Sequence, residues 1–127
     1  TICEFAPMSR LLPLASLLIC HGGQMTVFEA LRNNVPVFVM PFQPEQSHSG
    51  VCLERIGCGR RLVPSQIFQG NSEVYINALT RMTENEIKSA IDGLVNNPQT
   101  AKRLSDIEIA IERCEGLQKL STMVEMV

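Results

Sequence analysis

The sequence predicts an α/β fold in which a parallel sheet is flanked by helices. Short apolar runs alternate with segments of helical periodicity, and the runs are continuous rather than alternately polar and apolar. Continuous runs are typical of parallel strands that are buried on both faces, and their alternation with helices predicts crossover units. Glycine or proline punctuates the runs, which favours short strands with tight exits.

The N-terminal half shows this alternation most clearly. Apolar and β-branched runs predict strands at residues 2–5, 17–20, 35–40 and 61–63. Between them we expect a short helical turn at residues 9–14 and helices at residues 26–33 and 44–56. Successive right-handed crossovers place such strands side by side, with their carboxyl ends along one edge of the sheet.

The C-terminal half is richer in charge and predicts solvated helices. Thr83 followed by Glu86 is the pattern of a capping box, so we expect a helix at residues 83–95 that ends before Asn96-Asn97-Pro98. A second helix is predicted at residues 99–114 and a last one at residues 117–127. Residues 64–79 show no clear period, and we expect a loop-rich insertion there.

Length and composition favour one soluble domain. Hydrophobic residues make up 45% of the 127 residues, and the formal net charge of -2 gives no electrostatic basis for binding nucleic acid or an anionic membrane. The longest apolar stretch, residues 11–20, contains a proline and is too short to cross a bilayer. Five cysteines without a CxxC pair indicate a reducing, cytoplasmic setting with no disulfide framework and no zinc site. No metal or cofactor is expected.

Three loops follow predicted strands and therefore meet at the carboxyl edge, where ligands of open α/β sheets bind. They span residues 5–8, 21–26 and 41–46. In the second loop, Gly22 and Gly23 allow close approach of the backbone to a ligand, and the helix that follows offers free N–H groups and a positive dipole end. His21 and Thr26 add donors suited to a diphosphate, and Glu29 lies one turn further on.

Each loop also has a purely structural interpretation, which the residues alone leave open. Thr26 and Glu29 have the spacing of a capping box, and His21 has the position of a packing residue. Glu45 and Gln46 favour the first turn of a helix whatever they bind, and Phe5 is compatible with a core position.

Taken together, the loops resemble the donor-binding signature of the UDP-glycosyltransferase superfamily, in particular its macrolide-type bacterial members. The stretch HGGQMTVFEALRNNVPVFVMPFQPEQ, residues 21–46, carries the resemblance, which covers residues 2–62 well and the remainder loosely. It implies a Rossmann-like sheet from the C-terminal domain of a GT-B glycosyltransferase. Glu45 stands where the plant-type pattern has Asp, so the resemblance does not fix the sugar.

The resemblance also implies a role for each loop residue. The donor diphosphate is expected to contact the second loop, the ribose one acid, the sugar the third loop, and the base the first loop. The diphosphate is expected to contact His21, Gly22, Gly23, Gln24, Met25 and Thr26. The ribose is expected to contact Glu29, and the sugar Glu45 and Gln46. The base is expected to contact Phe5 and Met8.

The implied function is the donor-binding part of an inverting, metal-independent transfer from a nucleoside diphosphate sugar, with UDP expected, to an unidentified acceptor. The acceptor base would lie in an N-terminal domain outside these 127 residues. We interpret residues 1–127 as a partial C-terminal domain that lacks its first strand–helix unit and is inactive alone.

Two alternatives remain at this point. The first is a non-catalytic or split-enzyme subunit, which needs a partner chain or a second copy at an exposed sheet edge. The second is part of a nucleotide-sugar epimerase. The His-Gly-Gly order and the Pro-Glu-Gln loop favour the transferase.

Overall fold

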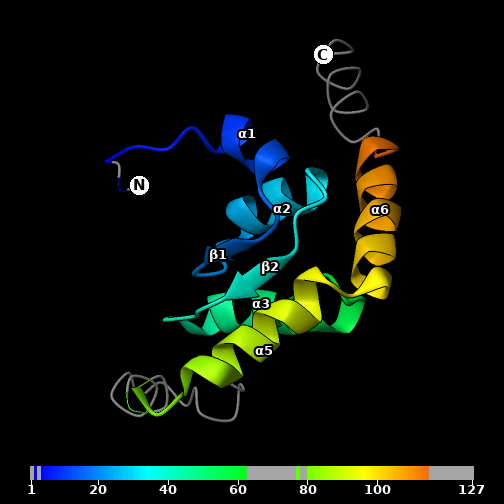
Figure 1. The fold of residues 1–127 in the computed structure, drawn as a ribbon. Helices are drawn as coiled ribbons and strands as arrows, with labels where there is room; N and C mark the ends of the chain where they lie inside the picture. Colours follow the sequence, from blue (N-terminus) through cyan, green and yellow to red (C-terminus); the bar gives the residue numbers. More distant parts are fainter. Residues whose placement is uncertain (1, 3, 63–76, 78–79, 115–127) are drawn as a thin grey trace.

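The computed structural model describes residues 2, 4–62, 77 and 80–114, and within them it forms a three-stranded parallel sheet (Figure 1). The strands lie side by side in chain order, with Val37 of the middle strand opposite Leu18 on one side and Gly59 on the other. They are β1 (Leu18–Cys20), β2 (Val37–Val39) and β3 (Gly59–Arg61). The predicted fold class, a Rossmann-like parallel sheet with flanking helices, is confirmed.

Helices connect and flank the strands. The crossovers are α2 (Gln24–Arg32), between β1 and β2, and α3 (Pro44–Ile56), between β2 and β3, and the two helices contact each other. Before the sheet lie α1 (Met8–Leu11) and the 3-10 turn η1 (Leu12–Leu14); after it come α5 (Glu84–Val95) and α6 (Pro98–Glu112). In Figure 1, α5 leads into α6, which reaches back to pack on α2.

The core forms around β2, whose three residues are all buried. Val37 and Val39 join one apolar cluster with residues from the helices and η1, while Phe38, between them, is 1% exposed and lies outside that cluster. Successive side chains of a strand point to opposite faces, so β2 is covered on both. This burial accounts for the continuous apolar run in the sequence.

Most elements lie where the sequence predicts them. The helix at residues 44–56 is confirmed to the residue, and Thr83 caps α5 by accepting from the Glu86 amide. The helix predicted at residues 26–33 begins two residues earlier, as α2. The helix predicted at residues 99–114 begins one residue earlier, as α6. Residues 117–127 lie outside the described residues, as do residues 64–79 except Asn77.

The strand predicted at residues 2–5 is wrong. Ile2, Glu4 and Phe5 have no strand structure, and the Ile2 and Phe5 side chains are 102% and 82% exposed. An apolar run becomes a strand only when a neighbouring strand satisfies its backbone N–H and C=O groups. Among the described strands, none lies beside this segment. The described residues contain no helix with the length and apolar character of a membrane crossing.

Candidate functional site

The loops that follow β1 and β2 meet at the carboxyl edge of the sheet. The His21 and Phe42 rings pack edge to face, with centroids 5.0 Å apart and planes at 71°. The His21 ring also lies against the strand exit, where Nδ1 is 3.4 Å from the Met40 carbonyl oxygen. Contacts on these two sides orient the imidazole, which remains exposed to solvent at the end of β1.

Gly22 lies in the loop after β1 and packs closely against the start of α3. It is buried, with φ of +91°, a backbone conformation that a side chain disfavours. A Cβ at this position would lie 2.7 Å from Val39 Cγ1 and 2.9 Å from the Gln46 carbonyl oxygen. Only glycine allows the loop to pass this closely, and the approach brings the first turns of α2 and α3 to the same edge.

The N-terminus of α2 receives no side-chain cap. Gly23 is the N-cap residue, with extended φ of −60° and ψ of 135°, and it contributes no capping side chain. The amides of Gln24, Met25 and Thr26 therefore head the helix with the positive end of its dipole. Thr26 is the third helical residue, so its predicted place at the cap is wrong, because Gly23 starts the helix earlier.

The carboxylates expected to bind sugar hydroxyls are both exposed. Glu29 lies one turn beyond the partly exposed Thr26 on α2, and Glu45 lies in the first turn of α3. Gln46 already has partners within its own loop, because its Oε1 accepts hydrogen bonds from the Phe42 amide at 2.8 Å and the Gln43 amide at 3.2 Å. The structural interpretation of Gln46 therefore holds for its oxygen, and its Nε2 is left as the group that can donate.

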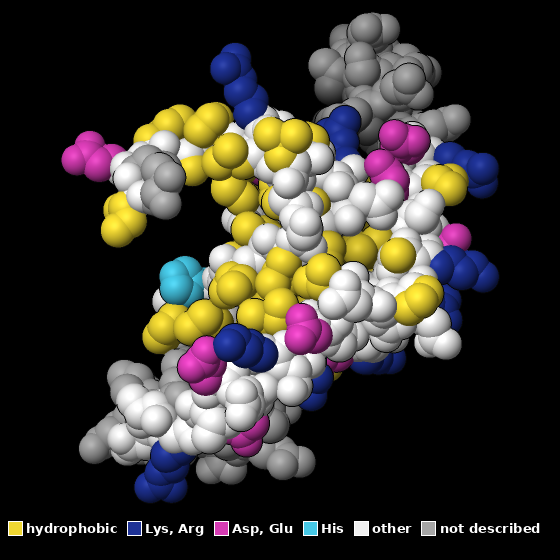
Figure 2. Space-filling model, viewed as in Figure 1, with side chains coloured by type: hydrophobic (Ala, Val, Ile, Leu, Met, Phe, Trp, Pro, Cys, Tyr) yellow, Lys and Arg dark blue, Asp and Glu magenta, His cyan; other side chains and the backbone are white. Residues whose placement is uncertain are grey.

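The first loop contributes two residues of different character. Phe5 projects from the chain ahead of α1, whereas Met8 is partly buried and packs against the apolar core. Figure 2 shows hydrophobic side chains of the N-terminal segment standing clear of the body of the molecule, with a hollow between this segment and the ends of the strands. Phe5 is thus the more accessible of the two expected base contacts.

Titratable groups near this edge include one partly buried thiol. Burial raises the pKa of Cys20, although a backbone hydrogen bond with Gly22 opposes the shift, so the thiol is protonated at neutral pH. Among the described residues, no group of three or more His, Cys, Asp or Glu side chains is placed to hold a metal ion.

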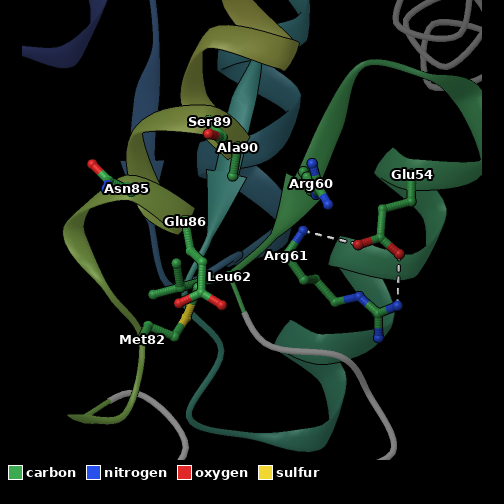
Figure 3. Close-up of a pocket in the computed structure, with 9 residues that line it drawn as sticks. All are labelled: Glu54, Arg60, Arg61, Leu62, Met82, Asn85, Glu86, Ser89 and Ala90. Atoms are coloured by element: carbon green, nitrogen blue, oxygen red, sulfur yellow. Dashed lines mark hydrogen bonds and ion pairs between the residues drawn. The ribbon is translucent and has the colours of Figure 1, made fainter.

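A second group of polar residues, which the sequence did not single out, lies beside β3. Arg61 donates to Glu54 Oε2 through Nη2 at 2.6 Å and to Glu54 Oε1 through its backbone amide at 2.9 Å (Figure 3). Partial burial raises the pKa of Glu54, but these hydrogen bonds and the charges of Arg61 and Arg60 outweigh it and leave that pKa below its usual value. The adjacent arginines at the start of the strand predicted at residues 61–63 were the signal available in the sequence, and the strand itself lies two residues earlier.

Exposed donors at a helix N-terminus lie beside an imidazole and a glycine turn at the carboxyl edge of a parallel sheet. This is the arrangement with which α/β proteins bind anions in the crevice outside that edge. Residues 1–115 match the family model of the glycosyltransferase family 28 C-terminal domain. The chain belongs to this family, and the resemblance seen in the sequence is confirmed.

Relatives and a solved structure agree with this assignment. The chain is 26% identical over 125 residues to the NDP-glycosyltransferase YjiC of Bacillus licheniformis, covering 98% of the chain and 28% of the relative. It is 28% identical over 115 residues to the demethyllactenocin mycarosyltransferase of Streptomyces fradiae, covering 90% and 24%. The crystal structure of the kitacinnamycin glycotransferase superposes with a TM-score of 0.81 at 21% identity, covering 99% of this chain and 29% of that one. The chain therefore spans about a quarter of the length of these relatives.

Proposed function

We propose that this chain binds the nucleoside diphosphate sugar donor of an inverting glycosyltransferase, with UDP as the nucleotide, and that a further domain or subunit binds the acceptor. The observation that carries the proposal is the uncapped N-terminus of α2, which Gly22 and His21 hold at the carboxyl edge. The printed name of the Bacillus relative supports a nucleoside diphosphate donor.

In this proposal, different residues bind different parts of the donor. The amides at the start of α2, together with His21 and the Thr26 hydroxyl, are donors for the diphosphate. Glu29 is an acceptor for the ribose hydroxyls, Glu45 and the Gln46 amide nitrogen face the sugar, and Phe5, flanked by Met8, is the surface for the base.

Catalysis in this proposal is electrostatic. As the acceptor oxygen attacks the anomeric carbon and the bond to the diphosphate breaks, negative charge grows on the departing phosphate oxygen. Fixed N–H groups and the α2 dipole stabilise that charge without reorganising, which lowers the barrier. A single displacement inverts the anomeric centre, and the base that takes the acceptor proton comes from the acceptor-binding domain.

Titration of the ¹⁵N-labelled chain with UDP tests donor binding. We expect saturable shifts at the amides of Gln24, Met25 and Thr26 and at the His21 ring, and we expect weaker shifts with UMP and none with uridine at the same residues. Thymidine diphosphate in place of UDP reports on the base. A folded sample that shows no saturation with UDP in the millimolar range contradicts the proposal.

A second candidate, a module that needs a partner chain or a second copy, is favoured by the edge of the sheet. Among the described strands, β1 pairs only with β2, and Ile19 of β1 is 51% exposed. An open edge strand of this kind is a template for pairing with another strand. Light scattering over a hundredfold concentration range, with Ile19→Lys as the matched variant, tests it: a mass that stays monomeric throughout contradicts self-association.

A further inference from the structure

The second polar group, beside β3, borders a cavity of about 630 Å3. Its walls come from the end of α3, the end of β3 and the first turns of α5, and Figure 3 shows Arg61 with Glu54 on one side and Met82 with Glu86 on the other. The cavity is at the exit of β3 and is lined by none of the residues assigned to the donor. It is lined by Glu54, Arg60, Arg61, Leu62, Met82, Asn85, Glu86, Ser89 and Ala90.

The Arg61 guanidinium has unmet hydrogen-bonding capacity. Its side chain is 9% exposed, and both Nε and Nη1 are buried without a hydrogen-bond partner. Buried N–H groups of a charged side chain are costly unless an acceptor meets them. The Glu54 carboxylate meets Nη2 only, so two further directions of the guanidinium still require oxygen atoms.

The same side chain is fixed in place before any ligand arrives. Its Cγ and Cδ lie over Gly50, so closely that a Cβ there would be 2.3 and 2.7 Å from them. The backbone amide of Arg61 and its Nη2 are both bound to Glu54. A side chain held at its stem and at Nη2 in this way loses little conformational freedom on binding, which favours affinity.

Most of the remaining groups around the cavity are donors. Arg60 adds a second guanidinium, Asn85 an amide and Ser89 a hydroxyl, and α5 contributes the positive end of its dipole. The two carboxylates are already engaged, Glu54 by Arg61 and Glu86 by the Thr83 amide and hydroxyl at 2.7 and 2.8 Å. The ligand that such a lining recognises carries several acceptor oxygens.

We propose that the cavity between β3 and α5 is an oxyanion-binding site, separate from the donor crevice, in which Arg61 is the principal donor to a phosphate or carboxylate group. The charges of the two arginines and two glutamates that line the cavity balance, so a small group of low charge is expected rather than a polyanion.

The test follows the Arg61 Nε–H resonance of the ¹⁵N-labelled chain during titration with inorganic phosphate, sodium acetate or glucose at constant ionic strength. We expect saturation with phosphate or with acetate, which distinguishes the two sources of the oxyanion. Disappearance of the resonance in Arg61→Lys assigns it. No movement with either anion, movement with glucose alone, or an unsaturated drift shared by all arginine resonances overturns the proposal.

Variants separate guanidinium geometry from charge. Arg61→Lys keeps the positive charge without Nε, and we expect phosphate, followed through the backbone amides of Asn85 and Ser89, to bind at least tenfold more weakly. Glu54→Gln retains an acceptor for Arg61 and removes a negative charge, so binding is expected to tighten. Arg113→Met, at the exposed end of α6, and Gly23→Ala, in the donor loop, are the controls and should leave it unchanged. Equal affinity in wild type, Arg61→Lys and Glu54→Gln, each folded by circular dichroism, contradicts the site.

Discussion

At the scale of single residues, two adjacent glycines serve different purposes. Gly22 is buried, has positive φ and leaves no room for a Cβ, whereas Gly23 has ordinary extended angles and open space around the Cβ position. The first is required by packing, and the second faces the crevice that we assign to the diphosphate. The sequence Gly-Gly alone does not separate these roles.

Gly22→Ala is therefore expected to destabilise the fold by about 2–4 kcal/mol, from the left-handed conformation and the overlap with Val39 and Gln46. Gly23→Ala should cost no more than about 1 kcal/mol as a change of N-cap residue, yet weaken UDP binding. Urea unfolding of both variants checks the stabilities. A Gly22→Ala protein as stable as wild type would show that the loop does not pass as closely as described.

At the scale of elements, α3 is held to the sheet by a side chain rather than by its own apolar stripe alone. Arg61 of β3 lies across Gly50 in the middle of α3 and reaches Glu54 one turn later. The helix that carries Glu45 and Gln46 in its first turn is thus attached to β3 near its other end.

Two helix glycines make a matched pair for testing the contact of Arg61 with α3. Alanine in place of glycine inside a helix usually stabilises by about 0.5–1 kcal/mol. We expect that gain for Gly93→Ala in α5, where a Cβ meets nothing within 4 Å. For Gly50→Ala we expect a net loss of about 1–3 kcal/mol, because Cβ would displace Arg61. Thermal or urea unfolding that ranks Gly50→Ala with Gly93→Ala contradicts the described packing.

The capping box of α5 is a further test at this scale. The Thr83 hydroxyl accepts from the Glu86 amide at 3.3 Å, and the Glu86 carboxylate accepts from the Thr83 amide and hydroxyl. We expect Thr83→Ala to destabilise the protein by about 1 kcal/mol and Thr83→Ser to be nearly neutral, as measured by urea unfolding. Equal stability of the two variants would mean that the cap does not contribute.

At the scale of the whole molecule, the Arg61–Glu54 pair makes stability depend on pH. The pKa of Glu54 in the folded state lies below its ordinary value of 4.5, so the charged form stabilises the fold above pH 4.5. That contribution is lost as the pH falls from 4.5 through the lowered folded pKa. We expect urea midpoints to fall over this window and to fall less in Glu54→Gln; identical slopes in the two proteins would contradict the pair's role.

The order of strands and helices was determined by the sequence itself. The continuous apolar run of β2 is buried on both faces, and residues 44–56 and Thr83 carry local signals that begin and end a helix. The motif at residues 21–46 likewise indicated the family and the edge at which the loops meet.

Other features were decided only by the tertiary structure. Residues 2–5 have the composition of a strand, but none of the described strands lies beside them. Thr26 has the chemistry of a cap but follows a glycine that starts the helix earlier, and the Gln46 oxygen accepts hydrogen bonds from its own loop. The role of Arg61 depends on Gly50 and Glu54, which only the fold brings into contact with it. Strand pairing, close packing and the burial of charge depend on residues distant in the chain, so a local pattern cannot specify them.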